Sequence, residues 1–139
     1  MEKRFINRYK SFCDSLSSLK KAKERDPADD FVLSGTAQKF NLTFDLSWKV
    51  MKDIIVKYHK IQDFATESPR ETLRKAYSVG LISDDCWMDM LSIRNNLDHD
   101  YDGSLVRESF YKIVEEYVPL LQAFQEKAEP YMKWMEEES

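Results

Sequence analysis

Residues 37–58 read AQKFNLTFDLSWKVMKDIIVKY, and this stretch decides the fold class. Its apolar residues recur every three or four positions, which is the period of one buried face of an α-helix. They are Ala37, Phe40, Phe44, Trp48, Met51, Ile55 and Tyr58. The pattern extends from about residue 29 to 60, and ~30 helical residues span ~45 Å. Such a length is typical of a helical bundle, in which we expect the aromatic side chains of this stripe to form core.

The rest of the chain also predicts helices. The expected spans are about 2–24, 29–60, 69–79, 84–98 and 104–135. With 3 Gly and 4 Pro, the chain has too few turn residues for a multi-stranded β protein. We therefore predict an all-α fold, an antiparallel up-and-down four-helix bundle with an additional short helix. Residues 1–139 are expected to form it as one domain.

A capping sequence starts the third predicted helix. In Ser68-Pro69-Arg70-Glu71, Ser68 is the expected N-cap, followed by Pro at the first helical position and by Glu71 three residues after the cap. Arg70 and Arg74 lie one turn apart at this helix N-terminus, which makes them a candidate anion site. Ordinary capping is the alternative interpretation.

Two prolines mark the last predicted helix. Pro119 removes a backbone hydrogen bond and crowds the preceding turn, so we predict a kink near residues 115–119. From Pro130 to Ser139 the chain is expected to fray or to contact a partner.

Composition excludes several function classes. Cys13 and Cys86 belong to no CxxC or His-rich cluster, so we expect two reduced thiols, no metal and no cofactor. The longest uncharged run, residues 117–125, is far short of a bilayer span, and the N-terminal residues form no apolar signal segment. We therefore expect a cytoplasmic protein without a membrane segment.

The net charge of −4 is unevenly distributed. Residues 1–25 carry eight basic and three acidic side chains, whereas residues 100–139 carry four basic and ten acidic ones. In an antiparallel bundle these ends could neutralise each other. Alternatively, the end of the first helix could meet a nucleic acid or an acidic partner through Lys20, Lys21, Lys23 and Arg25. Because the chain is acidic overall, we expect any RNA contact to be local and sensitive to salt.

Residues 94–101, Arg-Asn-Asn-Leu-Asp-His-Asp-Tyr, hold the densest chemistry of the chain. Arginine can hold a phosphate through a planar fork of donors, and histidine can exchange a proton near neutral pH. On a regular helix Asn95 shares a face with His99 and could orient its imidazole. A purely structural interpretation competes, because Arg94 and Asp98 have the spacing of an ordinary ion pair and His99 could complement a helix C-terminus.

The spacing of Arg94 and His99 sets a geometric condition. The two residues are five apart, which separates them by ~140° around a regular helix. One regular helix therefore does not direct both side chains at the same atom. Either the helix ends near Asp98, or a second copy of the motif completes the site in a symmetric dimer.

The string Arg94-x4-His99-x-Tyr101 resembles the R-x4-H-x-Y signature of the HEPN superfamily. More specifically, the chain resembles the nucleotidyltransferase substrate-binding proteins, the HepT-like partners of minimal nucleotidyltransferases. Further segments follow the order of that family: residues 40–48, 68–71, 80–82 and Trp87. The resemblance implies a helical bundle and a two-fold homodimer, whose groove brings both copies of Arg94 and His99 together.

The resemblance also implies an activity and a partner. The activity is metal-independent RNA cleavage, in which an RNA 2′-hydroxyl attacks its neighbouring phosphate and leaves a 2′,3′-cyclic end. Arg94 would hold the phosphate, His99 would transfer protons, and Asn95 would orient the imidazole. The partner is a minimal nucleotidyltransferase encoded nearby, as in a toxin–antitoxin pair, which places AMP on Tyr101.

Two other functions stay open. The chain could be a non-catalytic subunit that binds a nucleotide or another substrate for the nucleotidyltransferase. The same residues would serve it: Arg94, Asn95, His99 and Tyr101. Alternatively, His99-Asp100 could be the His-Asp pair of a metal phosphohydrolase, although His59 is the only other imidazole in the chain.

Overall fold

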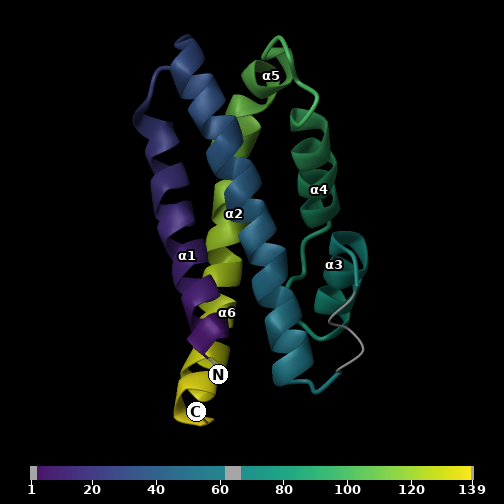
Figure 1. Ribbon diagram of the computed structural model, residues 1–139. Helices are drawn as coiled ribbons and strands as arrows, with labels where there is room; N and C mark the ends of the chain where they lie inside the picture. Colours follow the sequence, from purple (N-terminus) through teal and green to yellow (C-terminus); the bar gives the residue numbers. More distant parts are fainter. Residues whose placement is uncertain (1–2, 62–66, 139) are drawn as a thin grey trace.

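The computed structural model describes residues 3–61 and 67–138, and every regular element in these ranges is helical (Figure 1). The elements are α1 (Lys3–Lys20), the 3-10 helix η1 (Lys21–Glu24), α2 (Asp30–Lys57), α3 (Pro69–Ser78), α4 (Cys86–Leu97), α5 (Ser104–Lys112), the π-helix η3 (Ile113–Tyr117) and α6 (Val118–Glu138). The predicted all-α fold is confirmed. None of the helices described combines the length and the apolar composition that crossing a bilayer requires.

The long helix α2 forms the centre of the bundle. It packs against α1, α3, α4, α5 and α6. In Figure 1, α1, α2, α4 and α6 run alternately up and down, and both chain ends lie at the lower end of the bundle. The basic first helix therefore lies against the acidic α6 in the antiparallel sense.

The core is built on aromatic side chains that α2 shares with its neighbours. Phe40 and Phe44 of α2 are completely buried and confirm the predicted core role for the middle of the aromatic stripe, whereas Trp48 is partly buried and Tyr58 is 43% exposed. Ring centroids lie 5.6–6.2 Å apart in four pairs: Phe12–Phe124, Phe40–Tyr117, Phe44–Trp87 and Trp87–Phe124. Ring pairs at such distances attract each other beyond the effect of burying their surface. The chain of contacts joins α1, α2, α4, η3 and α6.

Hydrogen bonds from the buried residues Ser15 and Tyr9 tie α1 to the helices on both sides of it. Ser15 of α1 and Thr43 of α2 share a hydrogen bond of 2.6 Å. The Tyr9 hydroxyl donates to the Glu129 carboxylate of α6 at 2.6 Å. Buried polar groups that lacked such partners would destabilise the fold, so these bonds favour one register of α1 against α2 and α6.

Local capping explains where two helices begin. The Asp29 carboxylate accepts a hydrogen bond from the backbone N–H of Phe31 at 2.8 Å and starts α2. The Ser68 hydroxyl accepts from the backbone N–H of Glu71 at 3.3 Å, which confirms the predicted N-cap of α3. Each cap satisfies a backbone donor that has no partner inside its helix.

The last predicted helix is divided by η3. The kink is predicted over residues 115–119, and the structure has a π-helical turn over Ile113–Tyr117, which ends two residues before Pro119. Because Pro119 has no N–H, the carbonyl group four residues earlier loses its usual partner, and a wider turn accommodates this loss.

The predicted fraying of the C-terminal segment is wrong. The α6 helix continues through Pro130 to Glu138. Met132 and Met135 are buried within the common core, and the partly buried Trp134 packs against it. Burial of these side chains outweighs the hydrogen bond that Pro130 removes.

Truncation of Met135 tests whether residues 130–138 are part of the folded core. Because Met135 is completely buried, we expect Met135→Ala to lower the free energy of unfolding by about 2–5 kcal/mol. Lys133→Ala, at an exposed position of the same turn, should change it by less than about 0.5 kcal/mol. Urea denaturation followed by circular dichroism measures both. Equal stabilities of the two variants would mean that the segment does not pack as described.

Candidate functional site

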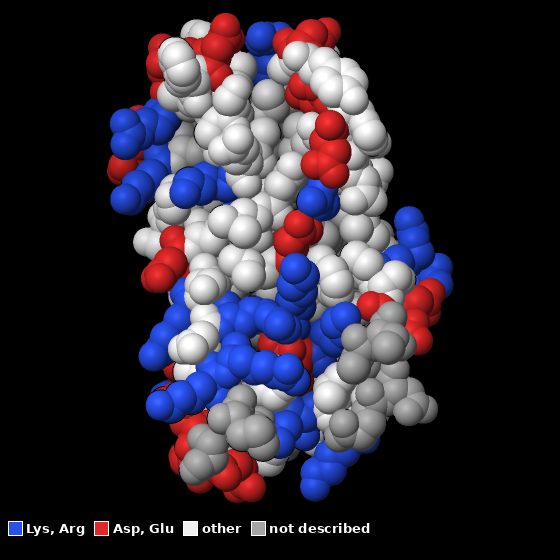
Figure 2. All heavy atoms as spheres, viewed as in Figure 1, with Lys and Arg blue, Asp and Glu red and all other residues white. Residues whose placement is uncertain are grey.

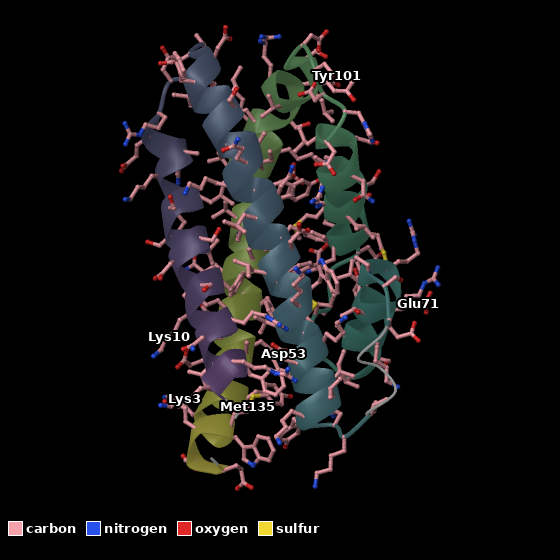
Figure 3. All side chains as sticks on the ribbon, viewed as in Figure 1. Lys3, Lys10, Asp53, Glu71, Tyr101 and Met135 are labelled. Atoms are coloured by element: carbon pink, nitrogen blue, oxygen red, sulfur yellow. The ribbon has the colours of Figure 1, made fainter. Side chains whose placement is uncertain are left out.

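The predicted motif lies where α4 ends and the chain turns into α5. Arg94 and Asn95 belong to the last turns of α4, which ends at Leu97, whereas His99 and Tyr101 follow it. Figure 3 shows Tyr101 at the end of the bundle opposite the chain termini. The helix therefore ends near Asp98, which is one of the two geometric conditions that the motif spacing sets.

Arg94 is held by two carboxylates. Its Nε and Nη2 groups donate to the two oxygens of Asp45 in α2, each at 2.8 Å, and Nη1 donates to Asp98 at 2.6 Å. The bidentate pair with Asp45 is partly buried, with side-chain exposures of 20% for Arg94 and 30% for Asp45. These hydrogen bonds, chiefly those to Asp45, raise the pKa of Arg94 further above its already high value. The fold itself thus fixes the orientation of the guanidinium group.

A cavity of about 310 Å³ lies between α2 and α4 beside this ion pair. We call it the α2/α4 cleft, and its polar and aromatic lining consists of Asp45, Trp48, Lys49, Arg94, Asn95 and Asp98. Two carboxylates and two cations line it, so their formal charges cancel. The ion pair between Arg94 and Asp98 that the sequence predicts is present.

The motif residues are only partly brought together. Asn95 lines the α2/α4 cleft with Arg94, whereas His99 lines neither this cleft nor the cavity beside Tyr101. His99 is exposed, and its ring centroid lies 6.4 Å from that of Tyr101. Among the described residues no hydrogen bond joins Asn95 to His99, because α4 ends between them. The predicted orientation of the imidazole by Asn95 is therefore absent from this single chain.

Tyr101 is a highly exposed member of the motif. Its side chain is 90% exposed, and it lines a second cavity of about 390 Å³ between the α4–α5 turn and the start of α2. The charged lining of this cavity consists of Asp30, Asp100, Asp102 and Arg107. The phenol is thus open to a large partner and lies in mainly acidic surroundings.

Asp100 has a structural task that sequence reasoning missed. Its two oxygens accept hydrogen bonds from the backbone N–H groups of Leu105 and Val106, each at 2.9 Å, and so hold the start of α5. Both oxygens are engaged in the fold, whereas the alternative interpretation of His99-Asp100 as a metal-binding pair would need at least one as a ligand. Within residues 3–61 and 67–138, no group of three or more His, Cys, Asp or Glu side chains could hold a metal ion.

The candidate anion site at the start of α3 contains a competing carboxylate. Arg74 donates to Glu71 at 2.5 Å, and both side chains are exposed. Arg70, one turn earlier, is also exposed. Ser68 caps the helix, which is the structural alternative that the sequence offered.

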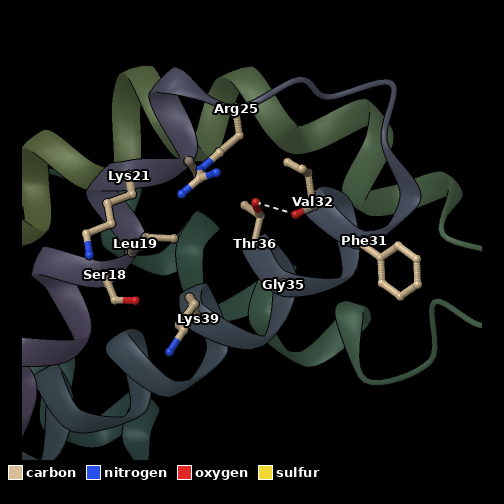
Figure 4. A pocket seen from close by; sticks show the side chains of 10 residues that line it. Ser18, Leu19, Lys21, Arg25, Phe31, Val32, Gly35, Thr36 and Lys39 are labelled. Atoms are coloured by element: carbon tan, nitrogen blue, oxygen red, sulfur yellow. Dashed lines mark hydrogen bonds between the residues drawn. The ribbon is translucent and has the colours of Figure 1, made fainter.

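The basic end of the first helix borders a cavity of about 290 Å³, shown in Figure 4. Lys21 and Arg25 approach it from the η1 side and Lys39 from α2. The neighbouring Phe31 ring is 90% exposed and points away from the centre of the cavity. The hydroxyl of Thr36, which also lines the cavity, donates to the Val32 carbonyl group within α2 at 2.7 Å. The lining of this cavity thus combines three cations with the apolar residues Leu19, Ala22 and Val32.

Sequence reasoning gives Asp45 no role, although the sequence contains a signal. Residues 31–58 include only two acidic side chains, Asp45 and Asp53. Each accepts a hydrogen bond from an arginine of another helix, Arg94 and Arg8 respectively. An isolated carboxylate in a long buried helix indicates an ion pair, but its partner is chosen by the packing of the helices.

These features define an all-α bundle protein with a polar cleft between α2 and α4 and an accessible tyrosine in the turn that follows. The family described as nucleotidyltransferase substrate binding protein like has a sequence model that matches residues 7–130. Because the match covers most of the chain, the chain belongs to this family. No curated protein matches the sequence. Membership of the wider HEPN superfamily stays a prediction.

Asp45→Asn tests the ion pair that orders the cleft. The substitution keeps the shape of the side chain and removes the charge that holds Arg94 from α2. We expect the free energy of unfolding to fall by about 1–3 kcal/mol, as for a partly buried hydrogen bond between charged groups. The matched control is Arg74→Gln, because the Arg74–Glu71 pair is exposed and should contribute less than about 1 kcal/mol. Equal losses in urea denaturation would contradict an ordering role for Asp45.

Proposed function

We propose that this chain is the substrate-binding subunit of a two-component nucleotidyltransferase whose catalytic subunit is a minimal nucleotidyltransferase encoded nearby. The observation that carries the proposal is the family match over residues 7–130. The sequence contains no glycine-rich phosphate loop and no nucleotidyltransferase signature. The catalytic groups for nucleotide transfer would therefore come from the partner, and this chain would bind and present the substrate.

The composition of the α2/α4 cleft supports a polar, compact substrate. Arg94 uses three of its five N–H groups on Asp45 and Asp98, so two remain for a ligand. Asn95 adds an exposed amide, and Trp48 adds a partly buried ring. Because the formal charges of the lining residues cancel, the cleft would favour the base or sugar of a nucleotide, which an indole ring and an amide can hold.

Tyr101 is the candidate acceptor of a nucleotidyl group. The phenol is accessible from solvent and lies outside the α2/α4 cleft, so an active site on the partner could reach it without opening the bundle. In the reaction, the phenol oxygen would attack the α-phosphorus of ATP and release pyrophosphate, with the phenol proton passing to a base of the partner. The acidic surroundings would favour a catalyst that brings its own cations.

A second candidate function is metal-independent RNA cleavage by a homodimer. Its specific support is the spacing Arg94-x4-His99-x-Tyr101 together with the end of α4 at Leu97. His99 would take the proton of the attacking 2′-hydroxyl, and a protonated histidine of the second copy would give one to the departing 5′-oxygen. Arg94 would stabilise the phosphate charge with the two N–H groups that Asp45 and Asp98 leave free. Asn95 would orient an imidazole across the dimer groove.

Co-expression tests the partnership and the acceptor together. We expect the chain to co-purify with the neighbouring minimal nucleotidyltransferase and to gain the mass of one AMP unit when ATP is supplied. Tyr101→Phe should abolish the mass gain. Tyr111→Phe should retain it, because Tyr111 is also exposed but lies on α5 outside the motif. Failure to co-purify would contradict the partnership, whereas modification at another residue would contradict only the role of Tyr101.

Incubation of the purified chain with RNA in the presence of EDTA tests the second candidate. We expect cleavage products with 2′,3′-cyclic phosphate ends, and a loss of at least about 100-fold in rate for His99→Ala, as when a general acid–base group is removed. The control is Asn96→Ala, at an exposed position near the end of α4, and this variant should cleave RNA normally. Uncleaved RNA, or full activity of His99→Ala, would leave the substrate-binding subunit as the function.

A further inference from the structure

A basic cavity lies between α1 and α2, away from the motif. Its volume is about 350 Å³, and its charged lining consists of Arg4, Arg8, Lys49, Lys52 and Asp53. In Figure 2, Lys and Arg side chains gather over the lower halves of α1 and α2, and Figure 3 places Asp53 between these helices. We call this feature the α1/α2 cavity.

The α1/α2 cavity contains a buried carboxylate that is only half satisfied. Asp53 is 5% exposed, and its Oδ1 atom accepts a hydrogen bond from Arg8 at 2.7 Å. Its Oδ2 atom is buried and has no hydrogen-bond partner. An unsatisfied buried oxygen of this kind destabilises a fold, so it indicates a group that the folded protein keeps for a ligand or a proton.

The cations of the cavity are positioned by neighbouring rings. The Arg4 guanidinium lies 4.8 Å from the centroid of the Phe5 ring. The ammonium groups of Lys52 and Lys49 lie 5.0 and 5.9 Å from the Trp48 centroid. Because each cation is attracted to a ring face, the long side chains lose less freedom when they bind an anion.

Positive charge is in local excess here, although the whole chain carries −4. Four cations surround one carboxylate, and they come from two helices that converge on a single cavity. A compact anion with several charges fits this arrangement better than an extended one, because an extended anion would also meet the acidic parts of the surface.

We propose that the α1/α2 cavity binds the polyphosphate chain of a nucleoside triphosphate. Arg4, Lys49 and Lys52 would neutralise phosphate oxygens, and Arg8 would join them when Asp53 releases it. None of the motif residues lines the cavity, so the inference goes beyond the proposed function and does not depend on it. RNA is the competing occupant, and the experiment below separates the two.

Asp53 makes the proposed binding dependent on pH. Burial raises the pKa of Asp53 to about 7, although the positive charges of Arg8, Arg4 and Lys52 act to lower it. Below this pH the carboxyl group is neutral, Arg8 is released for phosphate, and the protonated oxygen can donate a hydrogen bond. Above it the carboxylate competes with phosphate for Arg8. The charged groups that face Asp53 or line its cavity are Arg4 and Arg8 from α1 and Lys49 and Lys52 from α2.

Calorimetric titration with inorganic triphosphate and with ATP tests the site. We expect both to bind, and Arg4→Gln to weaken binding about tenfold, as for the loss of one charged hydrogen bond. Lys10→Gln is the matched control, since Lys10 is an exposed cation of the same helix that does not line the cavity. A titration with a short single-stranded RNA, made without terminal phosphates, forms the comparison.

Asp53→Asn supplies an independent test. At a pH about one unit above 7, where wild-type Asp53 is ionised, the variant should bind triphosphate about tenfold more tightly, because a nearby negative charge is gone. One unit below, wild type and variant should bind alike. Comparing them at each pH removes the titration of the phosphate itself. No binding of triphosphate, equal weakening by Arg4→Gln and Lys10→Gln, or tighter binding of the RNA would overturn the proposal.

Discussion

Two arginine–carboxylate pairs hold the central helix α2 to its neighbours, and the rest of the structure depends on them. Arg94 of α4 binds Asp45, and Arg8 of α1 binds Asp53. Partly buried charges must be paired, since an isolated charge is costly to remove from water. The two pairs therefore help to set the register of α1 and α4 against α2, and with it the shape of both polar cavities.

The fold thus constrains the side chains of the motif to different degrees. Arg94 is fixed by the fold, whereas His99 and Tyr101 lie on an exposed turn whose end Asp100 anchors to the start of α5. This division suits a subunit that keeps a preformed cleft and offers an exposed side chain to a partner. For RNA cleavage the two carboxylates would compete with the phosphate for the charge of Arg94, so the ion pair that orders the cleft would also oppose that reaction.

The sequence predicted those features that depend on local patterns. Apolar spacing located the helices, and the Ser68 sequence located the start of α3, because both effects act within a few turns of one chain segment. The pairs of Asp45 and Asp53 could not be predicted, since their partners lie 49 and 45 residues away in sequence. The helical order of residues 130–138 was missed because Pro130 and the acidic residues suggested that the helix ends there. Burial of Met132 and Met135 in the core keeps this segment helical. The motif residues were found as a string, but only the fold shows that Arg94 and His99 face different surroundings.

We propose that the chain contacts its nucleotidyltransferase through the α4–α5 turn, which carries the exposed Tyr101. Amide hydrogen exchange of the chain, alone and with the neighbouring nucleotidyltransferase bound, tests it most directly. The account predicts that slowing of exchange on binding is greatest in the peptide that spans residues 94–105. Slowing confined to α1 or α3, with this peptide unchanged, would contradict the account.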